Sequence, residues 1–230
     1  HSDPAATVEE YAIRLVNLLQ LYGVSPAQIE GGILGSVVPM LSGRVLAALQ
    51  LLCKARILTV GPGLKSGIKL RLDNPAQLGA ELLCGAVAAL EEGPGPLAVI
   101  SADTAISIMA VNGKQELVGG VILPGPQLSL SALVQKTAQL PQIDLSAPAS
   151  SSILGKNTSA CLQNGFVLGT AGLLDGLAER FQAELGPDIR FYATGNLPRT
   201  IREACRTPIH YRETLITDGL HRIWLRNRKG

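Results

Sequence analysis

Aromatic residues are scarce in this sequence. Only 3% of its 230 residues are aromatic, namely three Phe, four Tyr and one Trp. Proteins that bind single-stranded nucleic acid stack its bases on aromatic side chains, so this scarcity argues against a nucleic-acid partner. The formal net charge of +2 is likewise too small to indicate a large polyanionic partner.

Clustered cysteines and long apolar runs are also missing. None of the four cysteines belongs to a CxxC pair or a Cys/His cluster, which argues against a zinc site and favours a reduced protein. No apolar run reaches the length of a membrane-spanning helix, and no signal peptide is visible. We therefore expect a cytoplasmic protein without a membrane partner.

The N-terminal quarter of the chain alternates between helix and strand. Thr7 and Glu10 form a capping box at the start of a helix, and residues 33–38 are predicted to be a buried strand. A helix at residues 45–52 and a strand at residues 57–60 follow. Two parallel strands alone would leave both sheet edges bare, so we expect an additional N-terminal segment or a partner to complete the sheet.

Strands dominate the chain after Pro96. The Asn112-Gly113 pair is a strong hairpin signal between two apolar runs. The predicted strands span residues 97–101, 104–111, 116–122 and 191–193. The predicted helices span residues 127–139, 165–185 and 215–225.

The stretch at residues 60–82, VGPGLKSGIKLRLDNPAQLGAEL, connects the two halves. Its GPG run forces a turn after a strand and places Lys65 on a loop. The Asp-Asn-Pro run at residues 73–75 predicts a helix start, with Glu81 about two turns into the helix. Two interpretations are open: a connection with a solvated Lys and Glu, or a site where a cationic loop and a helix carboxylate converge.

Several motifs in this chain resemble type III pantothenate kinases. GPGLKSG at residues 61–67 and LDNPAQLGAEL at residues 72–82 are similar to that family's central signature, GPGxKTG…YDNPxxxGADR. GGVILPG at residues 119–125 and GKNT at residues 155–158 match further family motifs in the same order. The resemblance covers nearly the whole chain. It implies phosphorylation of pantothenate by ATP, the first step of coenzyme A synthesis.

The resemblance also implies a fold, that of the actin, Hsp70 and sugar kinase superfamily. This fold is α/β, with two Rossmann-like, ribonuclease H-like lobes. We expect a first lobe at residues 1–95, lacking the N-terminal strands that carry the family's DxGNT phosphate loop. The second lobe, residues 96–230, should have a five-stranded mixed sheet with its first three strands antiparallel, flanked by helices, and should carry a dimerisation surface.

The resemblance assigns roles to individual residues. Glu81 takes the position of the family's catalytic Asp, after Gly79 and Ala80 of the substrate-binding run. Thr158 matches a Thr that touches pantothenate near the dimer interface, although Asn157 and Thr158 also fit a plain helix cap. The positions that match ATP-binding residues are Thr104, Thr194 and Gly195.

Four polar positions of the family's site are changed in this chain. Leu72 replaces a substrate-binding Tyr, Leu82 replaces an Arg, and Ser101 replaces the Asp that binds a monovalent cation, potassium or ammonium. Asp103 lies roughly 6.5 Å further along and is either a substitute for that Asp or a turn residue; we favour the turn. Glu81 keeps a carboxylate but displaces it by about 1 to 1.5 Å, which can cost roughly a hundredfold in rate.

Three hypotheses remain open from the sequence. In the first, which we favour, the chain is a degenerate subunit that dimerises with an active paralogue and lends it Thr158. In the second, it is a self-sufficient but altered kinase that uses Glu81 and a segment before His1. In the third, it is a non-catalytic binding or regulatory protein on this fold. The implied ligands are pantothenate, ATP with Mg, and a monovalent cation; a homo-dimer is the alternative assembly.

Overall fold

The computed structural model describes residues 3, 5–36, 39–147 and 152–228. No helix in this described part of the chain is both long enough and apolar enough to cross a membrane. The helices are α1 (Val8–Leu21), α2 (Pro39–Leu52), α3 (Ala80–Glu91), α4 (Pro126–Gln135), α5 (Thr158–Leu185), α6 (Arg199–Ala204) and α7 (Leu215–Asn227). The strands are β1 (Gly32–Leu34), β2 (Ile57–Thr59), β3 (Lys69–Leu70), β4 (Leu97–Ala102), β5 (Ala105–Val111), β6 (Glu116–Pro124), β7 (Arg190–Gly195) and β8 (Ile209–Tyr211).

The first lobe follows the predicted order of helix, strand, helix, strand. The capping box is confirmed: the Thr7 hydroxyl accepts from the Glu10 amide at 3.2 Å, and the Glu10 carboxylate accepts from the Thr7 amide at 2.7 Å. β1 and β2 pair in parallel as a two-stranded sheet. β1 ends earlier than predicted, at Leu34, and residues 37 and 38 of the predicted strand lie outside the described residues.

The second sheet has six strands in the order β3-β6-β5-β4-β7-β8. β4, β5 and β6 are antiparallel, while β7 pairs in parallel with β4 and β8 in parallel with β7. The five strands β4 to β8 confirm the five-stranded mixed sheet predicted for residues 96–230. The sequence did not predict β3, which adds a sixth strand beside β6.

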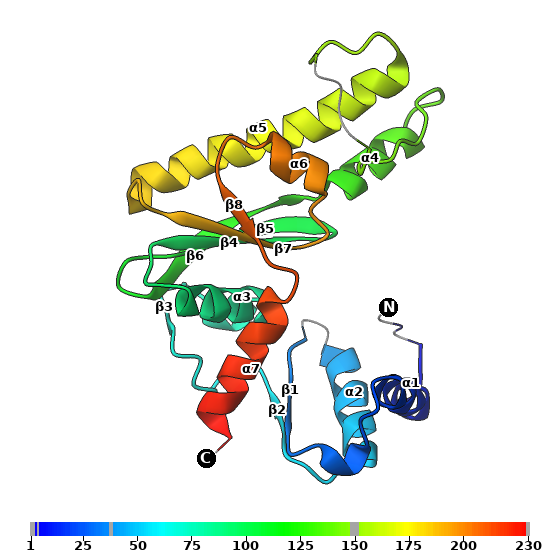
Figure 1. The fold of residues 1–230 in the computed structure, drawn as a ribbon, viewed down its shortest axis with the longest axis vertical. Helices are drawn as coiled ribbons and strands as arrows, with labels where there is room; N and C mark the ends of the chain where they lie inside the picture. Colours follow the sequence, from blue (N-terminus) through cyan, green and yellow to red (C-terminus); the bar gives the residue numbers. More distant parts are fainter. Residues whose placement is uncertain (1–2, 4, 37–38, 148–151, 229–230) are drawn as a thin grey trace.

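Helices cover both faces of this sheet, so the second lobe has three layers. Figure 1 shows α3 and α7 on one face and α5 with α6 on the other. Side chains of β4 alternate between the faces: Leu97 and Val99 join the core under α3, whereas Ala98 and Ile100 join the core under α5. β3 and α3 lie before residue 95 in the sequence, yet both pack with the second sheet. The lobe boundary at residue 95 stays a prediction.

The helix α7 packs against α3 more closely than ordinary side chains permit. A Cβ atom added at Gly219 of α7 would overlap the carbonyl oxygen of Cys84 in α3. The same helix touches the first lobe, where a Cβ at Gly31 would lie 2.9 Å from the ring of Trp224. The helix α7 therefore holds α3 in place and joins it to β1.

We predict that Gly219→Ala destabilises the protein by about 2 kcal/mol, because the new methyl meets rigid backbone in a packed interface. Gly172→Ala is the matched control, since Gly172 lies in α5 with nothing within 4 Å of an added Cβ. The free energy of unfolding of that control should rise by up to about 1 kcal/mol, because Ala has a higher helix propensity than Gly. Urea unfolding of both variants measures these changes in stability. Equal unfolding midpoints for the two variants would contradict the close approach of α7 to α3.

Candidate functional site

The stretch predicted as one helix from residue 73 is two separate elements. Residues Pro75–Gln77 form a short 3-10 helix, and the Asn74 side chain makes no capping hydrogen bond. Leu78 and Gly79 then return to extended conformations, and α3 begins at Ala80 with Gly79 as its N-cap. The prediction of one continuous helix was wrong because the turn started by the proline does not propagate. Glu81 lies in the first turn of α3 instead of two turns in.

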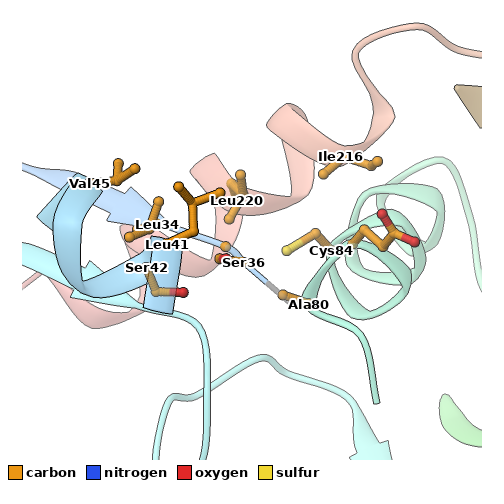
Figure 2. A pocket seen from close by; sticks show the side chains of 11 residues that line it. Leu34, Ser36, Leu41, Ser42, Val45, Ala80, Cys84, Ile216 and Leu220 are labelled. Carbon is orange, nitrogen blue, oxygen red and sulfur yellow. The ribbon is translucent and has the colours of Figure 1, made fainter. Parts of the chain in front are cut away.

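A cleft lies between the first lobe and α3. Its larger part, about 690 Å³, is lined by the GPGLKSG loop and by residues 75–80 and Leu83. Its smaller part, about 370 Å³, lies between β1, α2, α3 and α7. Figure 2 shows the side chains of these four elements around the smaller part. The two parts adjoin, since Ser36, Ser42 and Ala80 line both, and each volume suits a small-molecule site.

Glu81 is the acidic residue that lines the smaller part of the cleft. Partial burial raises the pKa of its carboxyl above the ordinary value, and the negative charge of Asp103 raises that pKa further. The side chain keeps contact with solvent, so water moderates both effects. A carboxylate with a raised pKa is a better proton acceptor, as general-base catalysis requires.

Asp103 occupies the turn between β4 and β5, as the sequence favoured. Its amide donates to the carbonyl oxygen of Ala105 at 2.9 Å. Its carboxylate accepts a hydrogen bond of 2.8 Å from the side-chain amide of Asn196, which follows β7. Asp103 therefore does more than close a turn, because it connects the carboxyl ends of β4 and β7 and acts electrostatically on Glu81.

The residues matched to nucleotide-binding and cation-binding positions gather at these same strand ends. Ser101 of β4, at the cation position, and Thr194 of β7, at a nucleotide position, are register partners, and both are buried, with exposed fractions of 7% and 1%. The Thr194 hydroxyl donates to the carbonyl oxygen of Glu213 at 3.4 Å, so it serves the fold. Gly195 leaves no room for a side chain, because a Cβ there would overlap the Ala102 carbonyl oxygen.

Thr104 is exposed in the β4–β5 turn, and its carbonyl oxygen accepts from the Gly125 amide at 2.9 Å. Gly125, the last residue of the GGVILPG motif, approaches this turn so closely that a Cβ would meet its backbone. The motif therefore has a structural reason in this chain, since it lets β6 end against the turn that carries Asp103.

Leu72 and Leu82, which the motif resemblance matches to polar positions of the family, belong to the core. Leu82 is 7% exposed and packs in the cluster under the sheet, with Leu72 at the edge of that cluster. Neither offers a hydrogen-bond donor to a ligand beside Glu81. A hydrophobic side chain is the choice that this packing favours, since an unpaired charge at Leu82 would be desolvated.

The residues here do not fit a charged cation site at residue 101. Ser101 brings a hydroxyl without a charge, and it is buried. Across the described residues, no three His, Cys, Asp or Glu side chains gather in a way that could hold a metal ion. Residue 101 therefore supplies no charged ligand for a monovalent cation.

Thr158 lies far from these residues in the fold. It begins α5, and the Asn157 side chain caps that helix by accepting from the Ala160 amide at 2.9 Å, which confirms the helix-cap interpretation. Because α5 covers the opposite face of the sheet from α3, Thr158 and Glu81 do not meet within one chain (Figure 1). Thr158 lines a separate apolar hollow with Leu162, Phe166 and Leu133, among others.

Sequence reasoning missed the residues of α7 that contact the cleft loop. The side chain of Asn227 exchanges hydrogen bonds with the backbone of Lys65, and Arg226 donates to the Ser66 carbonyl oxygen. No local sequence pattern indicates a contact between two residues that are 162 positions apart. The helix predicted at residues 215–225 extends to Asn227 in the structure.

Comparison with known proteins decides the family. A profile described as type III pantothenate kinase matches residues 1–180. The type III pantothenate kinase of Koribacter versatilis (strain Ellin345) is 36% identical over 222 residues, covering 96% of this chain and 80% of that protein. The chain belongs to the type III pantothenate kinase family. This membership confirms the resemblance drawn from the motifs.

Other family members are about as similar. The type III pantothenate kinase of Dehalococcoides mccartyi (strain ATCC BAA-2100 / JCM 16839 / KCTC 5957 / BAV1) is 37% identical over 220 residues, covering 96% of this chain and 83% of that protein. Among solved structures, the inorganic polyphosphate/ATP-glucomannokinase from Arthrobacter sp. strain KM aligns with a TM-score of 0.45. That alignment has 16% identity and covers 97% of this chain and 86% of that one.

We predict that Asp103→Asn lowers the pKa of Glu81 toward its ordinary value near 4.5, because a negative charge beside it is removed. Carboxyl NMR titration of wild type and variant measures this directly. The pKa of Glu116, lowered by hydrogen bonds from Asn112 and Arg71, is the internal control and should not move. An unchanged Glu81 pKa would refute the coupling.

The same shift fixes the sign of a stability effect. The folded state raises the pKa of Glu81, so its contribution to the free energy of unfolding is fully present below the unfolded pKa. That contribution is lost as pH rises through the folded pKa. Glu81→Gln should therefore gain stability relative to wild type as pH rises from 4 to 7, as denaturation at each pH will show.

Proposed function

We propose that this chain is a degenerate subunit of a type III pantothenate kinase, which works in a dimer with an active homologous chain. The complex would transfer a phosphoryl group from ATP to pantothenate in coenzyme A synthesis. One observation carries the proposal. The cleft and its glycine-rich loop are kept, whereas Leu82 packs into the core and Ser101 is buried at positions where the family has charged groups.

The chemistry of phosphoryl transfer explains why these changes matter. The reaction needs a base for the hydroxyl group, positive charge around the transferred phosphoryl group, and accurate positioning. Glu81 can serve as the base, since burial and Asp103 raise its pKa. However, Asp103 adds a negative charge at the strand ends, which opposes the approach of phosphate oxygens. A site that has a base but no positive charge around the phosphoryl group supports substrate binding better than phosphoryl transfer.

The position of Thr158 supports a role across a dimer interface. It is exposed at the start of α5, on the face of the sheet opposite Glu81. Large apolar side chains are exposed just before that helix, with Ile153 63% and Leu154 74% accessible. Such a surface is typical of an interaction site. We propose that this end of α5 meets the partner and that Thr158 completes the partner's pantothenate site.

A second candidate is a self-sufficient but altered kinase. The raised pKa of Glu81 favours it, because the direction of that shift is the one that a general base needs. A non-catalytic regulatory protein on the same fold is the third possibility. Mg, a monovalent cation and a cytoplasmic location remain predictions that come with the family.

We predict that Thr158→Ala raises the KM for pantothenate of the co-expressed complex about tenfold, the loss expected for one hydrogen bond to a charged ligand. The complex contains this chain and an intact family member from the same genome. Ser159→Ala is the matched control, since Ser159 is exposed beside Thr158 and should leave KM unchanged. If the partner's rate and KM are the same with this chain absent, present or mutated, the shared-site proposal fails.

A further inference from the structure

The end of α7 is attached to the loop that lines the larger part of the cleft. The Lys65 amide donates to Asn227 Oδ1 at 3.0 Å, and Asn227 Nδ2 donates back to the Lys65 carbonyl oxygen at 3.0 Å. The Arg226 guanidinium donates to the next carbonyl oxygen, that of Ser66. Two consecutive residues of α7 thus bind two consecutive residues of the loop.

Both side chains are themselves held in place. Asn227 Nδ2 also donates to the Ile223 carbonyl oxygen at 2.7 Å, one turn back in α7. The Arg226 guanidinium forms an ion pair of 3.1 Å with Glu91, the last residue of α3. The contacts therefore connect the loop to α7 and, through Arg226, to the helix that carries Glu81.

Contacts from outside the loop help to fix its conformation. Gly63 and Gly67 both have positive φ, at 90° and 84°, and glycines lose more conformational freedom on ordering than other residues. Leu64 and Ser66 line the cleft, while the Lys65 side chain is exposed. Fixing the Lys65 backbone from α7 orients its two neighbours toward the cleft.

We propose that Asn227 and Arg226 are positioning residues for the cleft, which hold the loop at residues 61–67 in the shape that binds the acceptor substrate. The same helix packs on α3 through Gly219 and Cys84. A single rigid helix therefore sets the distance between the loop and Glu81. This step rests on the proposed function, since it takes the larger part of the cleft to be the pantothenate site.

The test uses the full chain with Asn227→Ala and Asn227→Asp. Amide hydrogen exchange of Lys65 should accelerate about tenfold in Asn227→Ala, the change expected for loss of one ordinary hydrogen bond. Trypsin should also cut faster after Lys65. Asn227→Asp keeps the acceptor for the Lys65 amide, so exchange there should stay slow. Arg222→Ala is the matched control, because Arg222 lies on α7 and its long, 3.9 Å ion pair is with Glu91, outside the loop.

Pantothenate binding by calorimetry separates a positioning role from a structural one. We expect Asn227→Ala to weaken the pantothenate Kd several-fold, with Arg222→Ala unchanged. Unchanged Lys65 exchange would overturn the attachment, and faster exchange with an unchanged Kd would overturn its role in the cleft. If wild type binds no pantothenate, the substrate assigned under the proposed function fails, and Lys65 exchange alone decides whether α7 holds the loop.

Discussion

The packing of α7 on α3 is the constraint on which the rest of the structure depends. Gly219 allows two helix backbones to approach until an added methyl would overlap the Cys84 carbonyl oxygen. This close packing of α7 on α3 places Trp224 against Gly31 beside β1. It also brings the last turn of α7 to Lys65. One helix from the end of the chain therefore unites the first lobe, the cleft loop and the helix of the candidate base. Backbone contacts of this kind tolerate little change.

Within this frame, close backbone contacts fix the shape of the site. Gly125 and Gly195 leave no room for a side chain, because a Cβ atom added at either residue would overlap a neighbouring carbonyl oxygen. Positions that would carry polar chemistry are buried instead, as Leu82 and Ser101 are. Burial and the negative charge of Asp103 both raise the pKa of Glu81. Binding in this cleft therefore depends on shape, whereas phosphoryl transfer depends on charge.

Features that depend on neighbouring residues were predictable from the sequence, and features that depend on distant ones were not. The capping box at Thr7 and the hairpin at Asn112 follow from a few adjacent residues. The strands β3 and β8 are two and three residues long, too short for any periodicity, and exist because a sheet edge accepts them. The start of α3, the Asp103–Asn196 hydrogen bond and the attachment of Asn227 to Lys65 were missed, because each is decided by tertiary contacts.

The central claim, that this chain is a degenerate subunit without effective turnover of its own, is tested most directly by measuring pantothenate binding and turnover on one sample of the isolated chain. Calorimetry should detect pantothenate binding, whereas a coupled assay of ADP release should show little or no phosphorylation with ATP. Any residual activity should disappear in Glu81→Gln, because that variant keeps the size of the side chain and removes the base. Turnover at rates typical of the family, on protein verified free of host kinase, would contradict the account.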